Sequence, residues 1–210
     1  MKKRIGETSY KETTFGVIPR SELIPLEIEG TKKAWDFVMK EYGKGAIPLT
    51  PDFLKKVHKR GFGWIFPEIG GRFRTIEVTV SGHTPPKFHM VPQLMTDFMN
   101  DIRIRLKYLP DISRPDFLKS LIDLLAWSHH RFLWIHPFAD YNGRIGRLLT
   151  NMILLNLNLP PVELKVERAK GRMAYVNALG KADEGDYEEL RKLIQSSIKE
   201  AAEKFDSRKK

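Results

Sequence analysis

The sequence predicts an all-α domain with one small β-hairpin. Apolar residues recur at helical spacing through most of the chain from Thr31 onward, and a single stretch, residues 71–91, alternates side-chain types as a β-strand does. Hydrophobic residues make up 41% and charged residues 30% of the 210 residues, which are ordinary values for a globular protein. Disordered and fibrous chains are therefore excluded, and the chain is long enough to bury a core.

Two helices are expected near the start of this domain, over residues 31–42 and 51–60. Thr31 is the predicted N-cap of the first helix and Gly43 ends it, while Pro51 opens the second. The first helix carries its apolar residues on one stripe: Ala34, Trp35, Val38 and Tyr42.

A short hairpin is expected next, in the stretch "GGRFRTIEVTVSGHTPPKFHMVP", residues 70–92. Every second residue from Ile76 to Val80 is β-branched and aliphatic, which is typical of a strand. A Ser-Gly pair and a Pro-Pro pair then interrupt the pattern, and such pairs favour turns.

Five further helices follow: over residues 92–109, 113–135 and 142–156, and one on each side of Gly185. Ser113 is the expected N-cap of the second of these, with Asp116 as its capping partner. The third is almost wholly apolar after Arg147, so we expect it to be buried on most of its surface.

The stretch "IHPFADYNGRIGRLL", residues 135–149, joins two of the apolar helices and is rich in polar side chains. Asn142 and Gly143 give the backbone freedom for a turn where the second helix starts, and the unpaired N–H groups of a helix start bind anions. Arg144 and Arg147 lie on one face of its first turns, where cations are unfavourable unless an anion is bound. Because guanidinium groups match phosphate oxygens, the stretch predicts a polyphosphate site.

His136 and Asp140 stand beside this predicted site. A carboxylate next to a polyphosphate is suited to hold Mg²⁺, and a neutral histidine is suited to take a proton from a hydroxyl. Together these residues predict phosphoryl or nucleotidyl transfer. Each alone has an ordinary structural interpretation, as a turn or an ion pair, so the prediction rests on their joint occurrence within twelve residues.

The segment "HPFADYNGRIGR", residues 136–147, resembles the signature of the Fic (filamentation induced by cAMP) family, H-P-F-x-[D/E]-G-N-G-R-x-x-R, at eleven of twelve positions. The likeness includes "GRFR", "SGHTPPKFHMVP" and "LNLPPVELK". It implies a Fic-type helical bundle in which the hairpin is a flap. It also implies three regions: an N-terminal extension (1–47), a Fic core (48–196), and a helix end with a basic tail (197–210).

Fic proteins typically transfer AMP from ATP·Mg²⁺ to a hydroxyl of a protein target. The resemblance implies that His136 is the catalytic base and that Asp140 holds Mg²⁺. It places nucleotide contacts at Asn142, Gly143, Arg144, Arg147 and, near the adenine, Tyr175. A flap comprising Thr84, Pro85, Pro86, Lys87 and Phe88 would dock the serine, threonine or tyrosine of the target by strand pairing.

Tyr141 is the one departure from the signature, which has glycine at this position. A left-handed backbone would cost a tyrosine about 1–2 kcal/mol and could distort the phosphate nest. A helical or extended backbone would leave the nest intact. We favour this second interpretation because the other signature residues are retained.

Many Fic proteins carry an inhibitory glutamate in the pattern [S/T]-x-x-x-E-[G/N], which pairs with the last arginine of the signature, here Arg147. "PLEIEG" resembles this pattern and indicates Glu29, whereas "SSIKEA" places Glu200 at the same spacing. Each stretch departs from the pattern at one position. Glu29 is preferred because it precedes the core, and the alternative that both are ordinary helix-end acids stays open.

Charge and composition narrow the partners. The net charge is +10, but residues 2–4 and 204–210 contribute three charges each and leave only four for the body, so nucleic acid is not the expected partner. The absence of cysteine excludes disulfides and thiolate metal sites. No apolar run approaches the length of a membrane span, and we expect a cytoplasmic protein without a membrane partner.

Alternatives to adenylyl transfer stay open at this point. The same site could transfer another group, such as UMP or phosphate, or remove AMP. A different class is a non-catalytic nucleic-acid or toxin–antitoxin interaction module on a Fic scaffold. Fic proteins often form homodimers, and the sequence identifies neither the oligomeric state nor the target.

Overall fold

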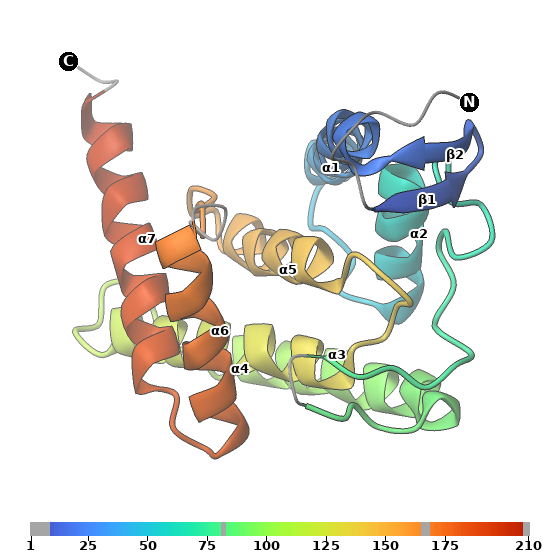
Figure 1. Cartoon of the computed structure of the whole chain (residues 1–210). Coiled ribbons are helices and arrows are strands. Elements are labelled where there is room, and N and C mark those ends of the chain that lie inside the picture. The colour runs from blue at the N-terminus through green and yellow to red at the C-terminus, as the bar shows by residue number, and fades with distance from the viewer. Residues whose placement is uncertain (1–8, 81–82, 165–168, 208–210) are drawn as a thin grey trace.

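Two apolar helices, α4 (Phe117–Ile135) and α5 (Asn142–Asn156), form the centre of the computed structural model, which describes residues 9–80, 83–164 and 169–207. The other helices are α1 (Arg20–Tyr42), α2 (Pro51–Phe62), α3 (Val91–Lys107), α6 (Ala169–Asp183) and α7 (Glu188–Ser207), with a 3-10 turn η1 (Phe88–Met90) before α3. Figure 1 shows α5 between the α6–α7 pair and the α1–α2 pair, with α3 beside α4. The predicted all-α class is confirmed.

The helix starts differ from prediction at α1 and α4, while α5 begins and ends where the sequence predicts. Helix α1 begins at Arg20, so Thr31 lies inside it and donates its hydroxyl hydrogen to the Glu27 carbonyl at 2.9 Å instead of capping. Helix α4 begins at Phe117 because Asp111 accepts hydrogen bonds from the amide and hydroxyl of Ser113, which holds that residue in a preceding turn.

Helix α1 packs against α2 through two glycines. A Cβ atom at Gly30 would lie 2.3 Å from the carbonyl oxygen of Gly61, so the backbones of the two helices are in contact there. The core-facing residues of α1 are Leu23, Glu27, Gly30, Ala34 and Val38. This stripe places one carboxylate, that of Glu27, among apolar neighbours one turn before the contact.

The two-stranded sheet of the structure lies at the N-terminus, where no strand was predicted. Strands β1 (Tyr10–Thr13) and β2 (Gly16–Pro19) pair antiparallel. In the predicted flap hairpin, the described residues form a single antiparallel bridge between Val80 and His83, while the Ser-Gly pair between them lies outside the described residues. The prolines that follow lack an N–H group, so they cannot extend the bridge into a ladder.

None of the helices in the described ranges is both long and apolar enough to span a membrane.

Candidate active site

The loop from α4 to α5 is shaped by two left-handed residues and one asparagine. His136 (φ 50°) ends α4, and Tyr141 (φ 65°) immediately precedes α5. The side-chain amide of Asn142 accepts a hydrogen bond from the Phe138 N–H at 2.9 Å and donates one to the Phe138 carbonyl at 2.8 Å. This side chain therefore braces the loop, which leaves the backbone of Asn142 as its means of contacting a nucleotide.

A cavity of about 640 Å³ opens beside this loop. It brings together five of the residues predicted from the sequence: His136, Gly143, Arg144, Arg147 and Tyr175. Apolar side chains of α4 and α6 line another part of it, among them Leu133, Trp134, Val176 and Leu179. The cavity thus combines a cationic part, which suits phosphate groups, with an apolar part, which suits the nucleobase of a nucleotide.

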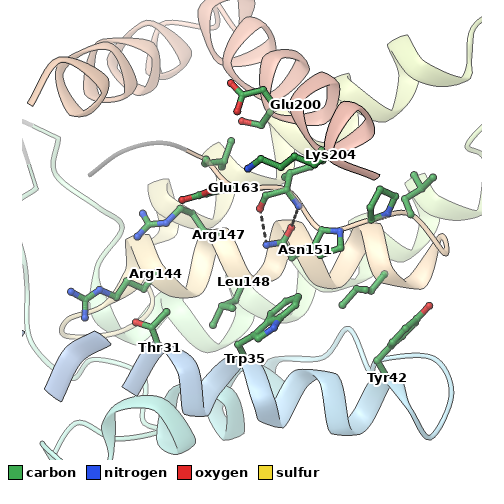
Figure 2. Close-up of a pocket in the computed structure, with 18 of the residues that line it drawn as sticks. Thr31, Trp35, Tyr42, Arg144, Arg147, Leu148, Asn151, Glu163, Glu200 and Lys204 are labelled. Carbon is green, nitrogen blue, oxygen red and sulfur yellow. Dashed lines mark hydrogen bonds between the residues drawn. The ribbon is translucent and has the colours of Figure 1, made fainter. Parts of the chain in front are cut away.

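A larger cavity, of about 820 Å³, lies between α1, α5 and α7 and shares the two arginines (Figure 2). Its wall includes Trp35 from α1 and Glu200 from α7, but neither His136 nor Tyr175. Because His136, the predicted general base, is absent from the wall of the larger cavity, the smaller cavity is the candidate active site.

His136 is a neutral imidazole with one nitrogen available. Its Nδ1 lies 3.2 Å from the Leu133 carbonyl, which can only accept, so Nδ1 carries the hydrogen and Nε2 has the lone pair. Burial lowers the pKa of His136, and the charge of Arg74 lowers it further, while the bond to Leu133 opposes both. The side chain is therefore unprotonated near neutral pH, as a general base must be.

Tyr141 adopts the left-handed backbone that we did not favour from the sequence. Glycine takes this conformation freely, so the tyrosine follows the backbone path open to the glycine of the signature, at a strain cost of about 1–2 kcal/mol. Its ring stacks on Phe62 with centroids 3.9 Å apart and planes 6° apart. Burial and the nearby Glu27 carboxylate raise the pKa of Tyr141, so its hydroxyl stays protonated and donates to Glu27 Oε1 at 3.0 Å.

One of the two predicted phosphate arginines, Arg144, pairs with the buried acid Glu27. Its side chain is 4% exposed; Oε2 lies 2.8 Å from Arg144 Nη2, and Oε1 lies 2.7 Å from Arg20 Nη1. The predicted Glu29 lies two residues further along α1 and is exposed, and the alternative Glu200 lines the larger cavity. The sequence analysis did not identify Glu27. Extending the apolar stripe of Ala34 and Val38 toward the N-terminus at helical spacing would have placed Glu27 on the core face of α1.

Tyr175 lies in the cavity wall near Arg147 and also contacts a buried group of uncharged side chains. Its hydroxyl lies 2.7 Å from His129 Nε2, and the Thr150 hydroxyl lies 3.1 Å from His129 Nδ1. Burial raises the pKa of Tyr175 to about 12 and lowers the pKa of His129 to about 3. His129 is thus a polar core contact rather than a metal ligand.

The predicted flap residues lie beside the cavity rather than in its wall. The cavity wall includes Val80 and His83, and His83 Nε2 lies 3.2 Å from the Trp134 carbonyl. The five predicted residues follow directly: Thr84, Lys87 and Phe88 are exposed, Pro86 is half-buried and Pro85 is buried.

Three contacts hold Asp140 in the loop between α4 and α5. Its Oδ1 accepts from the Tyr141 N–H at 2.7 Å, and its Oδ2 pairs with Lys11 of β1 at 2.9 Å. Its backbone carbonyl accepts from Nε2 of His58, because His58 Nδ1 accepts from the Gly71 N–H. Burial lowers the pKa of His58 to about 4, so this imidazole stays neutral.

A magnesium ion fits Asp140 only in company with a nucleotide. The described residues contain no group of three or more histidines or acids that could hold a metal ion. Mg²⁺ is commonly bound by one or two carboxylates together with waters and substrate phosphates, and Asp140, with 43% of its side chain exposed, offers one such carboxylate.

Removing the Lys11 ammonium is expected to strengthen metal binding, because that cation occupies one oxygen of Asp140. An exposed ion pair contributes about 0.2–1 kcal/mol, so Lys11→Ala should lower the dissociation constant for Mn²⁺ up to about fivefold in the presence of ADP. Electron paramagnetic resonance of free Mn²⁺ measures this constant. Lys32→Ala removes an equal charge from an exposed position of α1 and is the control; equal constants for the two variants would contradict the expectation.

Comparison with known proteins identifies the family of this chain. The profile of the Fic/DOC family matches residues 48–154, which include the loop and most of α5. A relative from Nematostella vectensis, named protein adenylyltransferase Fic, is 33% identical over 83% of this chain. One of the same name from Aedes aegypti is 34% identical over 66% of the chain. The chain spans 38% and 25% of the lengths of these two relatives.

A solved structure of Fic-1 from C. elegans superposes with a TM-score of 0.64 at 27% sequence identity, covering 86% of this chain and 50% of that one. The family profile covers half of the chain and the relative from Nematostella vectensis is 33% identical over most of it, so the chain belongs to the Fic/DOC family.

Proposed function

We propose that this chain is a protein adenylyltransferase, which transfers AMP from ATP to a hydroxyl of a protein target. The observation that carries the proposal is the neutral His136, with Nε2 available, in one cavity with Arg144, Arg147 and the start of α5. The names of the relatives from Nematostella vectensis and Aedes aegypti support it.

The reaction requires proton removal and charge neutralisation. His136 Nε2 accepts the proton as the target hydroxyl oxygen attacks the α-phosphorus, and the bond from that phosphorus to the bridging oxygen breaks to release pyrophosphate. Arg144, Arg147 and the N–H groups at the start of α5 hold the outer phosphates in position for this in-line displacement. Asp140 would hold Mg²⁺, which neutralises phosphate charge when bound.

The target hydroxyl approaches from the flap. The segment 84–88 lies next to the cavity residue His83, and its described backbone forms no ladder with the rest of the chain. Because Pro85 and Pro86 carry no N–H, an extended target segment would pair with the N–H groups of Thr84 and Lys87, and such pairing reads few side chains. The acceptor is a serine, threonine or tyrosine, since only these side chains carry a hydroxyl.

Glu27 restrains the site in the form described. Its carboxylate neutralises Arg144, which the β- and γ-phosphates need, and its bond from Tyr141 fastens it to the residue before α5. Regulation of the site therefore involves Glu27 in preference to Glu29, while Glu200 remains the C-terminal alternative.

Two labels on ATP separate the candidate reactions. The purified protein and a lysate are incubated with Mg²⁺ and ATP carrying ³²P at either the α- or the γ-phosphate. We expect protein-bound label only from the α position, because adenylylation releases the γ-phosphate within pyrophosphate. Label retained only from the γ position would show a phosphotransferase instead, and label retained from neither would contradict the proposal.

A further inference from the structure

Arg74 has a buried guanidinium that is surrounded by backbone carbonyls. Its side chain is 0% exposed, and the nearest carboxylate among the described residues, that of Glu77, lies 3.6 Å away and is mostly exposed. Four carbonyl oxygens accept its hydrogens: Nε donates to His136 at 2.8 Å, Nη1 to Ile76 at 3.0 Å, and Nη2 to Ile135 at 3.4 Å and to Pro86. A buried cation with so little carboxylate compensation is costly, so these carbonyl bonds keep it in place.

Two of these carbonyls belong to the end of α4. The last carbonyls of a helix lack partners within the helix, and the negative end of the helix dipole favours a cation there. The guanidinium of Arg74 donates to the carbonyls of Ile135 and His136. The backbone N–H of Arg74 donates to the Pro137 carbonyl at 2.8 Å. These bonds surround His136 in its left-handed conformation (φ 50°, ψ 60°), which sets the direction of its imidazole.

The same guanidinium reaches the flap. Nη2, which bonds the end of α4, also donates to the carbonyl of Pro86 in the flap segment. A lysine could not replace these contacts, because its ammonium is a single point on a flexible stem, whereas the planar fork of arginine reaches several acceptors at once.

We infer that Arg74 is a positioning residue that sets the spacing between the flap-docked target hydroxyl and Nε2 of His136. The inference rests on the proposed function for the identity of the reacting groups. Arg74 touches neither the nucleotide cavity nor Arg144 and Arg147, so its effect falls on the transfer step and on flap docking rather than on nucleotide binding.

The test compares Arg74→Lys with Arg72→Lys, the same substitution at an exposed position of the same segment. The acceptors are the lysate proteins that the wild type labels from α-labelled ATP. A misplacement of about 1 Å can cost about 100-fold, so we expect Arg74→Lys to slow AMP transfer 10- to 100-fold. The dissociation constant for a non-hydrolysable ATP analogue should change less than twofold, and Arg72→Lys should match the wild type. Unchanged transfer in Arg74→Lys would overturn the inference.

Two nuclear magnetic resonance measurements read the contacts without any activity. In the wild type, a scalar coupling across the hydrogen bond should join Arg74 Nε to the His136 carbonyl carbon. In Arg74→Lys, amide hydrogen exchange over residues 83–90 should accelerate. Absence of the coupling in the wild type, or unchanged exchange in the variant, would overturn the inference even if the variant is active.

A second variant covers the case in which Arg74→Lys does not fold. Pro86→Gly frees the backbone at the carbonyl that accepts the hydrogen bond from Arg74, so it weakens that bond from the acceptor side. It changes no residue of the core. It should slow transfer and accelerate exchange over residues 83–90, and a wild-type transfer rate would overturn the inference. If the wild type transfers no AMP to any acceptor, the proposed function fails, whereas the coupling and exchange data still report whether Arg74 joins the flap to His136.

Discussion

Replacing His136 by alanine is expected to lower AMP transfer by about 10²- to 10⁴-fold, the usual contribution of a general base. Nε2 of His136 carries the lone pair that accepts the proton, so its loss slows the transfer step. The contacts to the phosphates come from α5, so the affinity for ATP should stay near that of the wild type. Intact-mass spectrometry after incubation with ATP·Mg²⁺ measures the incorporated AMP. His89→Ala, at an exposed position outside the cavity wall, is the matched control and should incorporate AMP as the wild type does.

The pH profile gives the same prediction a second readout. Burial, the first cause, lowers the pKa of His136 below the ordinary imidazole value of 6.5. The base form is therefore present above this lowered pKa, and the transfer rate should stay level as the pH falls through 6.5 and drop only below it. An inflection at or above pH 6.5, or AMP incorporation that persists in His136→Ala, would contradict the assignment of His136 as the base.

Replacing Glu27 by glutamine is expected to raise AMP incorporation about 10- to 100-fold, since a hydrogen bond to a charged group contributes about 1.5–3 kcal/mol. The substitution removes the negative charge that neutralises Arg144 but keeps an oxygen that can accept from Tyr141. Arg144 is then available to the outer phosphates of ATP. The initial rate of α-labelled AMP incorporation, at ATP concentrations below saturation, is the measurement.

Two variants serve as controls for Glu27. Glu29→Gln removes the same charge from the exposed face of the same helix and should leave the rate unchanged. Glu200→Gln tests the C-terminal alternative from the wall of the larger cavity. If AMP incorporation rises in Glu29→Gln or Glu200→Gln but not in Glu27→Gln, that residue is the inhibitory glutamate instead of Glu27. A fall in Glu27→Gln would show instead that Glu27 positions Arg144 for catalysis.

The sequence predicted the centre of the site well because its signals are local. Helix α5 starts at Asn142 and ends at Asn156 as expected, and His136, Gly143, Arg144 and Arg147 share one cavity. Tyr175 lines the same cavity, but only the family resemblance indicated it. A Pro, a turn and a run of apolar residues within twenty positions are sufficient to define such a loop and helix. The motif therefore indicated the arrangement without knowledge of any distant contact.

The contacts that reach the loop from elsewhere could not be predicted in this way. Motif spacing indicated Glu29, but the phase of α1 decides which acid faces the core, and that phase depends on the contact of Gly30 with Gly61. The backbone of Tyr141 was predicted wrongly because the stacking on Phe62 and the bond to Glu27, both distant in sequence, offset its strain. The role of Arg74 likewise depends on carbonyls whose positions follow only from the fold.

The contact of Gly30 with Gly61 also divides α1 into a fixed part and a part that is less firmly held. Beyond Gly30, α1 is held by backbone contact with α2, but the turn before it contains Pro25, which has no N–H to complete the helical hydrogen bonding. Glu27 lies between this weak point and the anchor. The two pairs Lys11–Asp140 and Glu27–Arg144 therefore join the part of the chain before Gly30 to the catalytic loop, so a displacement of β1 or of the first turns of α1 changes the charges around Asp140 and Arg144.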